Sequence, residues 1–236
     1  MKLIQVFAVS VCVAGCVAPP PPAPQVVEAA PNEETVRTSG AGLREADFVR
    51  IAGRIEPVAE RMCQEADAFN QCDFLIVMDD RANQPPNAYQ FITKNGRPVL
   101  AVTIPLLDEV QNDDELAFVI GHEAAHHVAG HIQQQSETAY QGAMLGSLTA
   151  TIFGADAEAI EAARDIGAFV GSRQFSKNHE IEADKLGALI ALEAGFDPRV
   201  GVGYFTRIPD PGQQFLGSHP SNSERIQAVQ TAISGA

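Results

Sequence analysis

Residues 122–126 carry the most restrictive pattern of this chain, His-Glu-Ala-Ala-His. On a helix, side chains four positions apart share a face and lie about 6 Å apart along the axis. His122 and His126 can therefore bind one metal ion together. Glu123 follows the first histidine and can reach a water molecule on the same ion, where it can act as a general base. The pattern predicts a zinc site for hydrolytic chemistry.

The segment around this pattern is expected to be helical. Residues 112–114 offer N-cap side chains and negative charge to a first turn, residues 116–120 are mostly apolar, and Gly130 can end the helix. Two histidines can also lie on a helix without any metal, so the zinc prediction needs a third ligand. The neighbouring pair His127 and His131 has no glutamate after its first member, and we expect both to be surface or helix-end histidines.

A possible third ligand comes about fifty residues later, in the helical pattern of residues 178–187. Glu180 and Asp184 are four positions apart and share a helix face. One carboxylate can bind the metal, while the other accepts a hydrogen bond from a ligand histidine and fixes its ring orientation. The alternative is an acidic helix face that is merely solvated. Glu182 lies off this face, and we expect it to be solvated.

The H-E-x-x-H pattern followed by E-x-x-x-D resembles the HtpX-like and CAAX-prenyl-protease family of zinc metallopeptidases (gluzincins). Within that family it resembles the periplasmic lipoprotein branch of the beta-barrel assembly-enhancing proteases. The resemblance covers roughly residues 45–230 and includes three further segments. These are Asn87-Ala88-Tyr89, the run from Val99 to Leu107, and His219-Pro220 with Arg225 six residues after the histidine.

The resemblance implies that His122, His126 and Glu180 bind one Zn²⁺ per chain. It makes Glu123 the general base and Asp184 the partner of a ligand histidine. The implied fold is α+β, a mostly helical zincin-like domain with a small β-sheet whose edge strand flanks the H-E-x-x-H helix.

A β-hairpin is expected from two extended patterns, Tyr89–Thr93 and Pro98–Ile104, around the turn pair Asn95-Gly96. Pro98 suits an edge strand. Together with the resemblance, this predicts an edge beside the zinc to which a substrate peptide can add as a strand. The residues assigned to that substrate edge are Asn87, Val99, Ala101 and Thr103.

Two residues near the C-terminus are given catalytic roles by the same resemblance. His219 either stabilises the oxyanion of the tetrahedral intermediate or occupies the open zinc position and silences the site, unless it merely neighbours a helix cap. Arg225 either steadies the intermediate or the substrate carbonyl, or pairs with an acid.

The N-terminus has the pattern of a targeting segment. Lys2 is followed by an apolar stretch too short to span a membrane as a mature helix. Val13-Ala14-Gly15-Cys16 resembles a bacterial lipobox, with an ordinary secretory signal as the alternative. We therefore expect a signal peptide at 1–15, a lipidated Cys16 with a Pro-rich tether at 16–40, and the metallopeptidase domain at 41–236. The expected location is the periplasm, with the lipid anchor in the outer membrane.

Three further patterns concern the predicted domain. Cys63 and Cys72 would be the thiols left after processing, and in an oxidising compartment we expect a disulfide, with two buried thiols as the alternative. Residues 41–64 have helical apolar spacing, in which Pro57 predicts a kink or two helices. The Ala- and Gly-rich stretch 138–173 predicts closely packed helices, with a membrane-facing or substrate-gating pair as the alternative.

The formal net charge of −14 argues against nucleic acid as a partner. The resemblance described above implies the function of a zinc-dependent endopeptidase of the bacterial envelope, which acts on misfolded or unassembled envelope proteins. The alternative is a chaperone-like envelope assembly factor that has a zinc site and little basal proteolysis.

Overall fold

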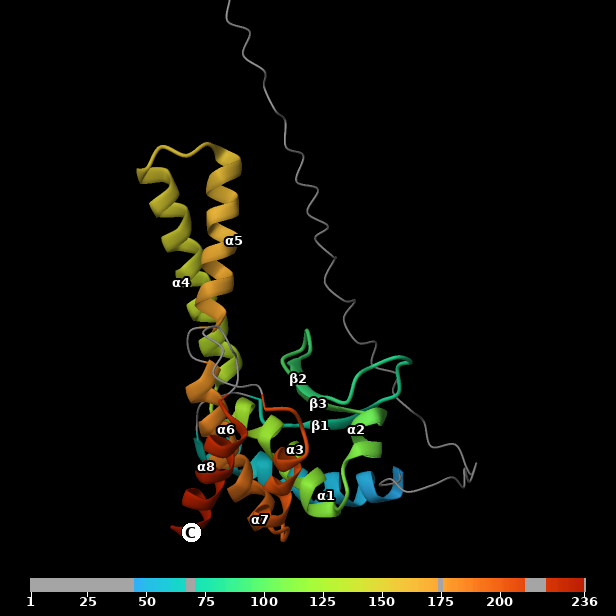
Figure 1. The fold of residues 1–236 in the computed structure, drawn as a ribbon. Helices are drawn as coiled ribbons and strands as arrows, with labels where there is room; N and C mark the ends of the chain where they lie inside the picture. Colours follow the sequence, from blue (N-terminus) through green and yellow to red (C-terminus); the bar gives the residue numbers. More distant parts are fainter. Residues whose placement is uncertain (1–44, 67–70, 174–175, 211–219, 236) are drawn as a thin grey trace, which may run out of the picture. The chain divides into compact units, whose positions relative to one another are not determined.

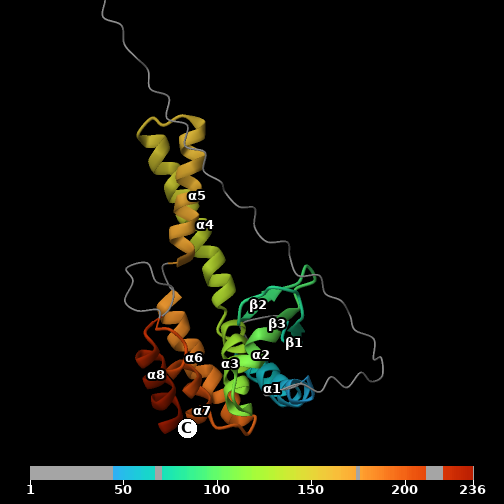
Figure 2. The same cartoon turned by 45° about the vertical axis from the view of Figure 1, so that its right-hand side comes forward.

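The structure is a computed structural model that describes residues 45–66, 71–173, 176–210 and 220–235. The predicted signal peptide, the tether, Cys16 and His219 lie outside these residues. Figures 1 and 2 show a small sheet beside a group of helices, the mostly helical α+β architecture expected from the sequence. No helix within the described residues is both long enough and apolar enough to cross a membrane.

The elements follow one another in a mixed order. They are α1 (Glu45–Ala66), β1 (Leu75–Asp79), β2 (Ala88–Ile92), β3 (Pro98–Thr103), α2 (Ile104–Glu109), α3 (Asp113–Val128), α4 (His131–Ile152), α5 (Ala157–Arg173), α6 (Ser176–Glu193), α7 (Pro198–Gly201), the 3-10 helix η1 (Val202–Thr206) and α8 (Asn222–Ser234).

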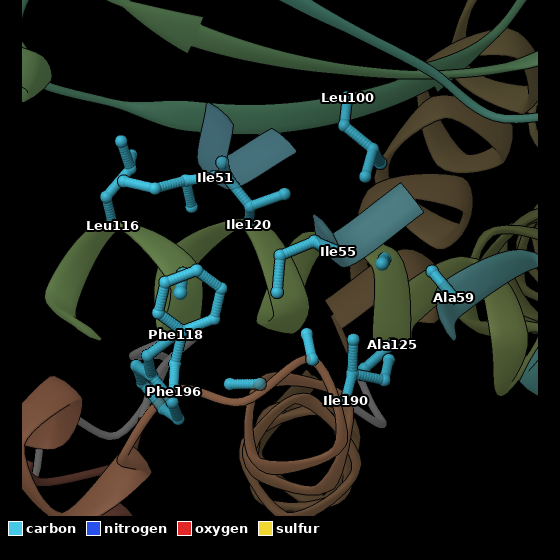
Figure 3. Close-up of a cluster of buried hydrophobic side chains, with 14 of the residues drawn as sticks. Ile51, Ile55, Ala59, Leu100, Leu116, Phe118, Ile120, Ala125, Ile190 and Phe196 are labelled. Atoms are coloured by element: carbon cyan, nitrogen blue, oxygen red, sulfur yellow. The ribbon is translucent and has the colours of Figure 1, made fainter. Parts of the chain in front are cut away.

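Helix α3 carries the H-E-x-x-H pattern and runs through the centre of the core. Its N-cap is Asn112, whose side chain accepts a hydrogen bond from the N–H of Glu115 at 2.9 Å. Buried residues lie on every side of α3, which packs against α1, α6 and the sheet. Figure 3 shows Phe118 and Ile120 of α3 among apolar side chains of α1, α6 and β3. The metal-ligand pattern therefore lies on one of the most constrained helices of the described fold.

The predicted hairpin is confirmed, and Gly96 in its turn has a φ of +85°. The expected position of β3 at the sheet edge is wrong, because the strand order is β1-β3-β2. β1 pairs parallel to β3 on the side that the hairpin leaves free, and all six residues of β3 are buried. The residues Val99, Ala101 and Thr103 thus lie in the central strand, and β2 is the edge strand beside α3.

The edge strand β2 is tied to β1 by a polar cluster. The hydroxyl of Tyr89 on β2 donates to the Asp79 carboxylate at 2.8 Å, and Arg81 donates to both oxygens of the same carboxylate at 2.8 Å. The hydrogen bonds from Arg81 lower the pKa of Asp79 to about 2 and, with the bond from Tyr89, outweigh the opposing effect of burial. The carboxylate is therefore ionised near neutral pH, and it anchors the N-terminal end of β2.

Helix α1 runs through Pro57 as one helix, so of the kink or the two helices expected there, the two separate helices are excluded. A proline removes only one backbone hydrogen bond. The buried face on both sides of it, from Phe48 to Cys63, holds the helix against the core. The structure joins Cys63 to Cys72 as a disulfide, with the Cα atoms 5.7 Å apart. This bond connects α1 to the segment that leads into β1.

Helices α4 and α5 pack against each other along a seam of small residues, as the Ala- and Gly-rich sequence predicts (Figure 1). A Cβ atom at Gly142, Gly146, Gly167 or Gly171 would overlap the backbone of the opposite helix. The large apolar side chains of both helices are mostly on the outside and exposed. They include Tyr140, Met144, Leu145, Leu148, Ile152, Ile166, Phe169 and Val170, and the C-cap residue Phe153 is exposed as well.

Candidate metal centre

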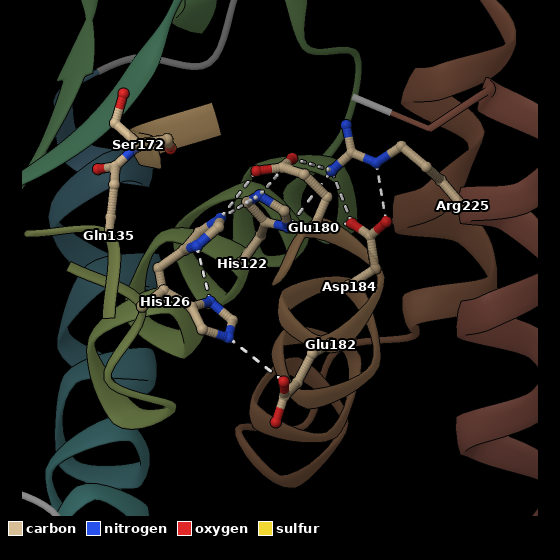
Figure 4. Close-up of polar contacts among 9 residues, drawn as sticks. His122, His126, Gln135, Ser172, Glu180, Glu182, Asp184 and Arg225 are labelled. Carbon is tan, nitrogen blue, oxygen red and sulfur yellow. Dashed lines mark hydrogen bonds and ion pairs between the residues drawn. The ribbon is translucent and has the colours of Figure 1, made fainter. Parts of the chain in front are cut away.

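Three predicted ligands from two helices meet at one point. His122 and His126 on α3 face each other with their Nε2 atoms 3.1 Å apart. Glu180 on α6 lies 3.6 Å from Nε2 of His122 and 3.3 Å from Nε2 of His126. Figure 4 shows the carboxylate pointing at the two rings. Among the described residues, these three side chains form a group whose ligand atoms all lie within 4.8 Å of one another.

The close approach of α3 and α6 at this point depends on two glycines. A Cβ atom at Gly187 would lie 2.6 Å from the backbone nitrogen of His122. A Cβ atom at Gly121 would lie 2.7 Å from the carbonyl oxygen of Gly187. Any larger side chain at either position would force the helices apart, and with them the ligands.

Behind His122 lies a buried ion pair. Asp184, whose side chain is fully buried, lies 2.9 Å from Nδ1 of His122. Arg225 on α8 donates two hydrogen bonds to Asp184, at 2.8 and 2.7 Å (Figure 4). Its guanidinium also stacks over Phe205. Burial alone would raise the pKa of Asp184, but the hydrogen bonds from His122 and Arg225 lower it. Of the two roles left open for Arg225, the structure shows the pairing with an acid.

The arrangement fits a bound metal ion in its donor atoms and in its charge. In both ligand histidines Nδ1 contacts another side chain, so Nε2 is the nitrogen that faces the common point. Burial would lower the pKa of His126, but its hydrogen bond to Glu180 and the negative charges of Glu123 and Glu180 raise it. The centre thus favours positive charge. Two imidazole nitrogens and one carboxylate form a donor set found in catalytic zinc sites with an open position.

Of the two positions expected for His127 and His131, the helix end is confirmed, while the surface is wrong, since both are buried. His127 packs edge-on against Phe74, and its Nε2 lies 3.0 Å from the carbonyl oxygen of Gln71. Its burial lowers its pKa. His131 is the first residue of α4, and Gly130, with a φ of +74°, lets the chain turn directly from α3 into that helix. As a result, His131 contacts the far side of His126, with the two Nδ1 atoms 2.9 Å apart.

A pocket opens over the three ligands. Its lining includes Glu123, which is partly exposed, residues Ala88 to Gln90 of the edge strand β2, and Ile132 and Gln135 from the first turns of α4. Glu123 thus shares a solvent-accessible space with the ligand set. Sequence reasoning missed Gln90, Ile132 and Gln135, because only the fold brings β2 and α4 to the same pocket.

The other residues of the predicted substrate edge have structural contacts. The hydroxyl of Thr103 is buried at the end of β3, where it accepts a hydrogen bond from the N–H of Asn87 at 2.9 Å. The same hydroxyl lies 3.0 Å from the carbonyl oxygen of Pro85. These contacts fix the loop that leads into β2. Glu182 is exposed as expected, and its carboxylate also lies 3.4 Å from Nε2 of His131.

Two histidines and a glutamate that converge beneath a pocket, with a further glutamate in its wall, define a metallopeptidase-type centre. Comparison with known proteins agrees with that class. The sequence profile of peptidase family M48 matches residues 50–233, and the chain therefore belongs to this family.

The curated relatives come from bacteria and from mitochondria. The chain is 31% identical over 137 residues to the mitochondrial metalloendopeptidase OMA1 of Arabidopsis thaliana, a match that covers 56% of this chain and 27% of the relative. Human OMA1 is 27% identical over 185 residues, a match that covers 72% of this chain and 34% of the relative. A putative beta-barrel assembly-enhancing protease of Vibrio cholerae is 32% identical over 130 residues, a match that covers 49% of this chain and 27% of the relative. The matched region is thus between about a quarter and a third of the length of these relatives.

Proposed function

We propose that this chain is a zinc-dependent endopeptidase of the bacterial envelope. The observation that carries the proposal is the convergence of His122, His126 and Glu180 beneath a pocket that Glu123 also lines. Membership of peptidase family M48 supports the reaction class. The names of the relatives, metalloendopeptidase and beta-barrel assembly-enhancing protease, support cleavage within polypeptides.

The proposed chemistry assigns each side chain one task. When bound, zinc polarises the scissile carbonyl and lowers the pKa of a water molecule toward about 7. Glu123 accepts the proton of the attacking water and delivers it to the leaving nitrogen as the peptide bond breaks. Asp184, held by Arg225, accepts the Nδ1–H of His122 and so presents its Nε2 to the pocket.

The edge strand β2 offers the substrate a backbone partner. The N–H of Thr103 donates to the carbonyl of Asn87 at 3.0 Å, so this pair is a hydrogen-bonded pair of the antiparallel ladder. Bonded and non-bonded pairs alternate along such a ladder. The N–H and C=O groups of Ala88 and Gln90 therefore point away from β3, and both residues line the pocket. A substrate in extended conformation can bind there as a fourth strand.

Replacing Gln90 with proline tests this binding mode. The substitution removes one outward N–H but leaves the β2–β3 ladder intact, and proline is tolerated in edge strands. We expect kcat/KM for an unfolded protein substrate to fall about tenfold, the scale of one lost backbone hydrogen bond. The matched control is Gln90→Ala, which also removes the amide side chain but keeps the N–H. Equal activity of the two variants would exclude strand addition at this position.

The cellular setting is proposed from the sequence and the relatives. The lipobox-like segment ending at Cys16 and the Pro-rich stretch after it support a lipid-anchored periplasmic enzyme, with the outer membrane as its site. The Cys63–Cys72 disulfide suits an oxidising compartment. Relatives named beta-barrel assembly-enhancing protease, including that of Escherichia coli, support misfolded or unassembled envelope proteins as substrates.

Metal removal tests the proposal as a whole. Purified protein is expected to contain about one zinc per chain and to cleave casein. Chelation should abolish cleavage, and added Zn²⁺ should restore it. A His219→Ala variant measured alongside distinguishes a blocking histidine, whose loss speeds cleavage, from one that assists the reaction. Zinc without cleavage in any variant would favour the chaperone-like alternative, and absence of zinc would contradict the metal assignment.

A further inference from the structure

We propose that His131 is a positioning residue for the metal ligand His126, and that it acts together with Glu182. The inference rests on the proposed metal centre and extends it. His131 belongs to neither the H-E-x-x-H nor the E-x-x-x-D pattern. It reaches the centre because α4 begins immediately after Gly130.

The contact between the two rings determines which nitrogen of His126 is free. Nδ1 of His126 lies 2.9 Å from Nδ1 of His131, while Nε2 of His126 faces His122 and Glu180. A histidine that binds a metal through Nε2 carries its proton on Nδ1. The Nδ1–H of His126 then donates to Nδ1 of His131. This hydrogen bond fixes both the tautomer and the orientation of the ligand ring.

His131 can accept that bond only if its own proton lies on Nε2. The Glu182 carboxylate is 3.4 Å from this atom and accepts from it. A continuous chain of donors and acceptors therefore runs from Glu182 through His131 to His126. In Figure 4, dashed lines connect His126 through the intervening ring to Glu182.

Packing holds the His131 ring in place. The residue is 3% exposed, and its ring stacks on that of His179, with centroids 4.2 Å apart and planes 10° from parallel. His179 and Glu182 both belong to α6, which also supplies Glu180. Helix α6 thus provides the ligand Glu180 and also His179 and Glu182, which contact the His131 ring.

The two ligand histidines are supported in different ways. His122 contacts a fully buried carboxylate directly, at 2.9 Å from Asp184. His126 is supported indirectly, because the ring of His131 lies between it and the Glu182 carboxylate, which is 64% exposed. Since an exposed carboxylate is well solvated, we expect substitution of Glu182 to have a smaller effect than substitution of His131.

The test compares His131→Leu, His131→Asn and His127→Leu in the whole protein. His127 is a matched control, because it is also a buried histidine beside the turn between α3 and α4, but its ring packs against Phe74 and its Nε2 lies 3.0 Å from the carbonyl oxygen of Gln71. Zinc affinity is measured by competition with a chelator, and the Co²⁺-substituted proteins are compared by their absorption spectra. Thermal unfolding is recorded for each variant, so that affinity is compared between folded proteins.

We expect His131→Leu to weaken zinc binding at least tenfold and to alter the Co²⁺ spectrum. Asparagine places an oxygen near the position of Nδ1, so His131→Asn should recover most of the affinity. His127→Leu should lower the unfolding temperature but leave the affinity within about twofold of the wild type. Glu182→Gln should weaken binding by a few-fold, whereas Glu193→Gln, on the same helix, should not.

Equal zinc affinity of wild type and His131→Leu would overturn the inference, as would a loss in His131→Asn as large as that in His131→Leu. An equal loss of affinity in His127→Leu would also overturn it, because general destabilisation would then account for the effect. A wild-type protein that binds no zinc would instead contradict the proposed function, so the two failures are distinguishable.

Discussion

The Glu123→Gln variant is expected to retain its zinc and to lose peptide cleavage. Glu123 lines the pocket but is not among the three side chains whose ligand atoms cluster, so its replacement leaves the donor set intact. Glutamine has nearly the same shape but cannot accept and return a proton. Loss of a general base typically lowers the rate by 10²–10⁴-fold, and we expect kcat to fall by about 10³-fold.

The measurement combines metal content with initial rates of casein cleavage. Glu137→Gln is a suitable control, because this exposed glutamate of α4 does not line the pocket. The control should cleave at the wild-type rate. Wild-type cleavage by Glu123→Gln would show that the assigned base is wrong, and loss of the zinc would show that Glu123 acts as a ligand.

The Asp184→Asn variant is expected to lose both stability and metal affinity. Asp184 is fully buried, and once its charge is removed, the acid left beside Arg225 among the described residues is the more distant Glu180, at 3.7 Å. Breaking a buried pair by removing one partner typically costs about 3–5 kcal/mol of unfolding free energy. His122 also loses a charged hydrogen-bond acceptor, which should weaken zinc binding about 10- to 100-fold.

A second buried carboxylate, paired with an exposed arginine, provides the control. Glu115 is 2% exposed, and Arg207 donates two hydrogen bonds of 2.6 Å to it, away from the metal ligands. Glu115→Gln should therefore lower the unfolding free energy without changing zinc affinity. The double variant Asp184→Asn/Arg225→Met should regain part of the stability but not the affinity. If Asp184→Asn behaves like Glu115→Gln in both measurements, Asp184 serves stability alone.

The parts of the centre that can be predicted from sequence are those with helical spacing. His122 and His126, and likewise Glu180 and Asp184, are four residues apart, so local geometry alone places each pair on one face. That Asp184 lies against His122 and is held by Arg225 depends on how α6 and α8 pack. Sequence can suggest an acid as a partner for Arg225, but only packing identifies which one.

The errors made from sequence have a common physical cause. A hairpin pattern shows that β2 and β3 pair, but not that β1 returns to cover the other side of β3, because that contact joins residues such as Leu75 and Val99 across twenty-four positions. Similarly, His131 looks like a helix-end residue until the turn at Gly130 places it against His126. In both cases a contact distant in sequence, or a change of chain direction, determined the role of the residue.

Because Gly121 and Gly187 bring the backbones of α3 and α6 into contact, main-chain atoms set the spacing between the ligands of the two helices. The conformational entropy lost in bringing the three donor atoms together is therefore lost when the two helices fold and pack, and not when the ion binds. A change at either glycine would displace several donors together, and no adjustment of a single side chain could correct it. Among related chains, we therefore expect Gly121 and Gly187 to be replaced less often than most of the residues that line the pocket.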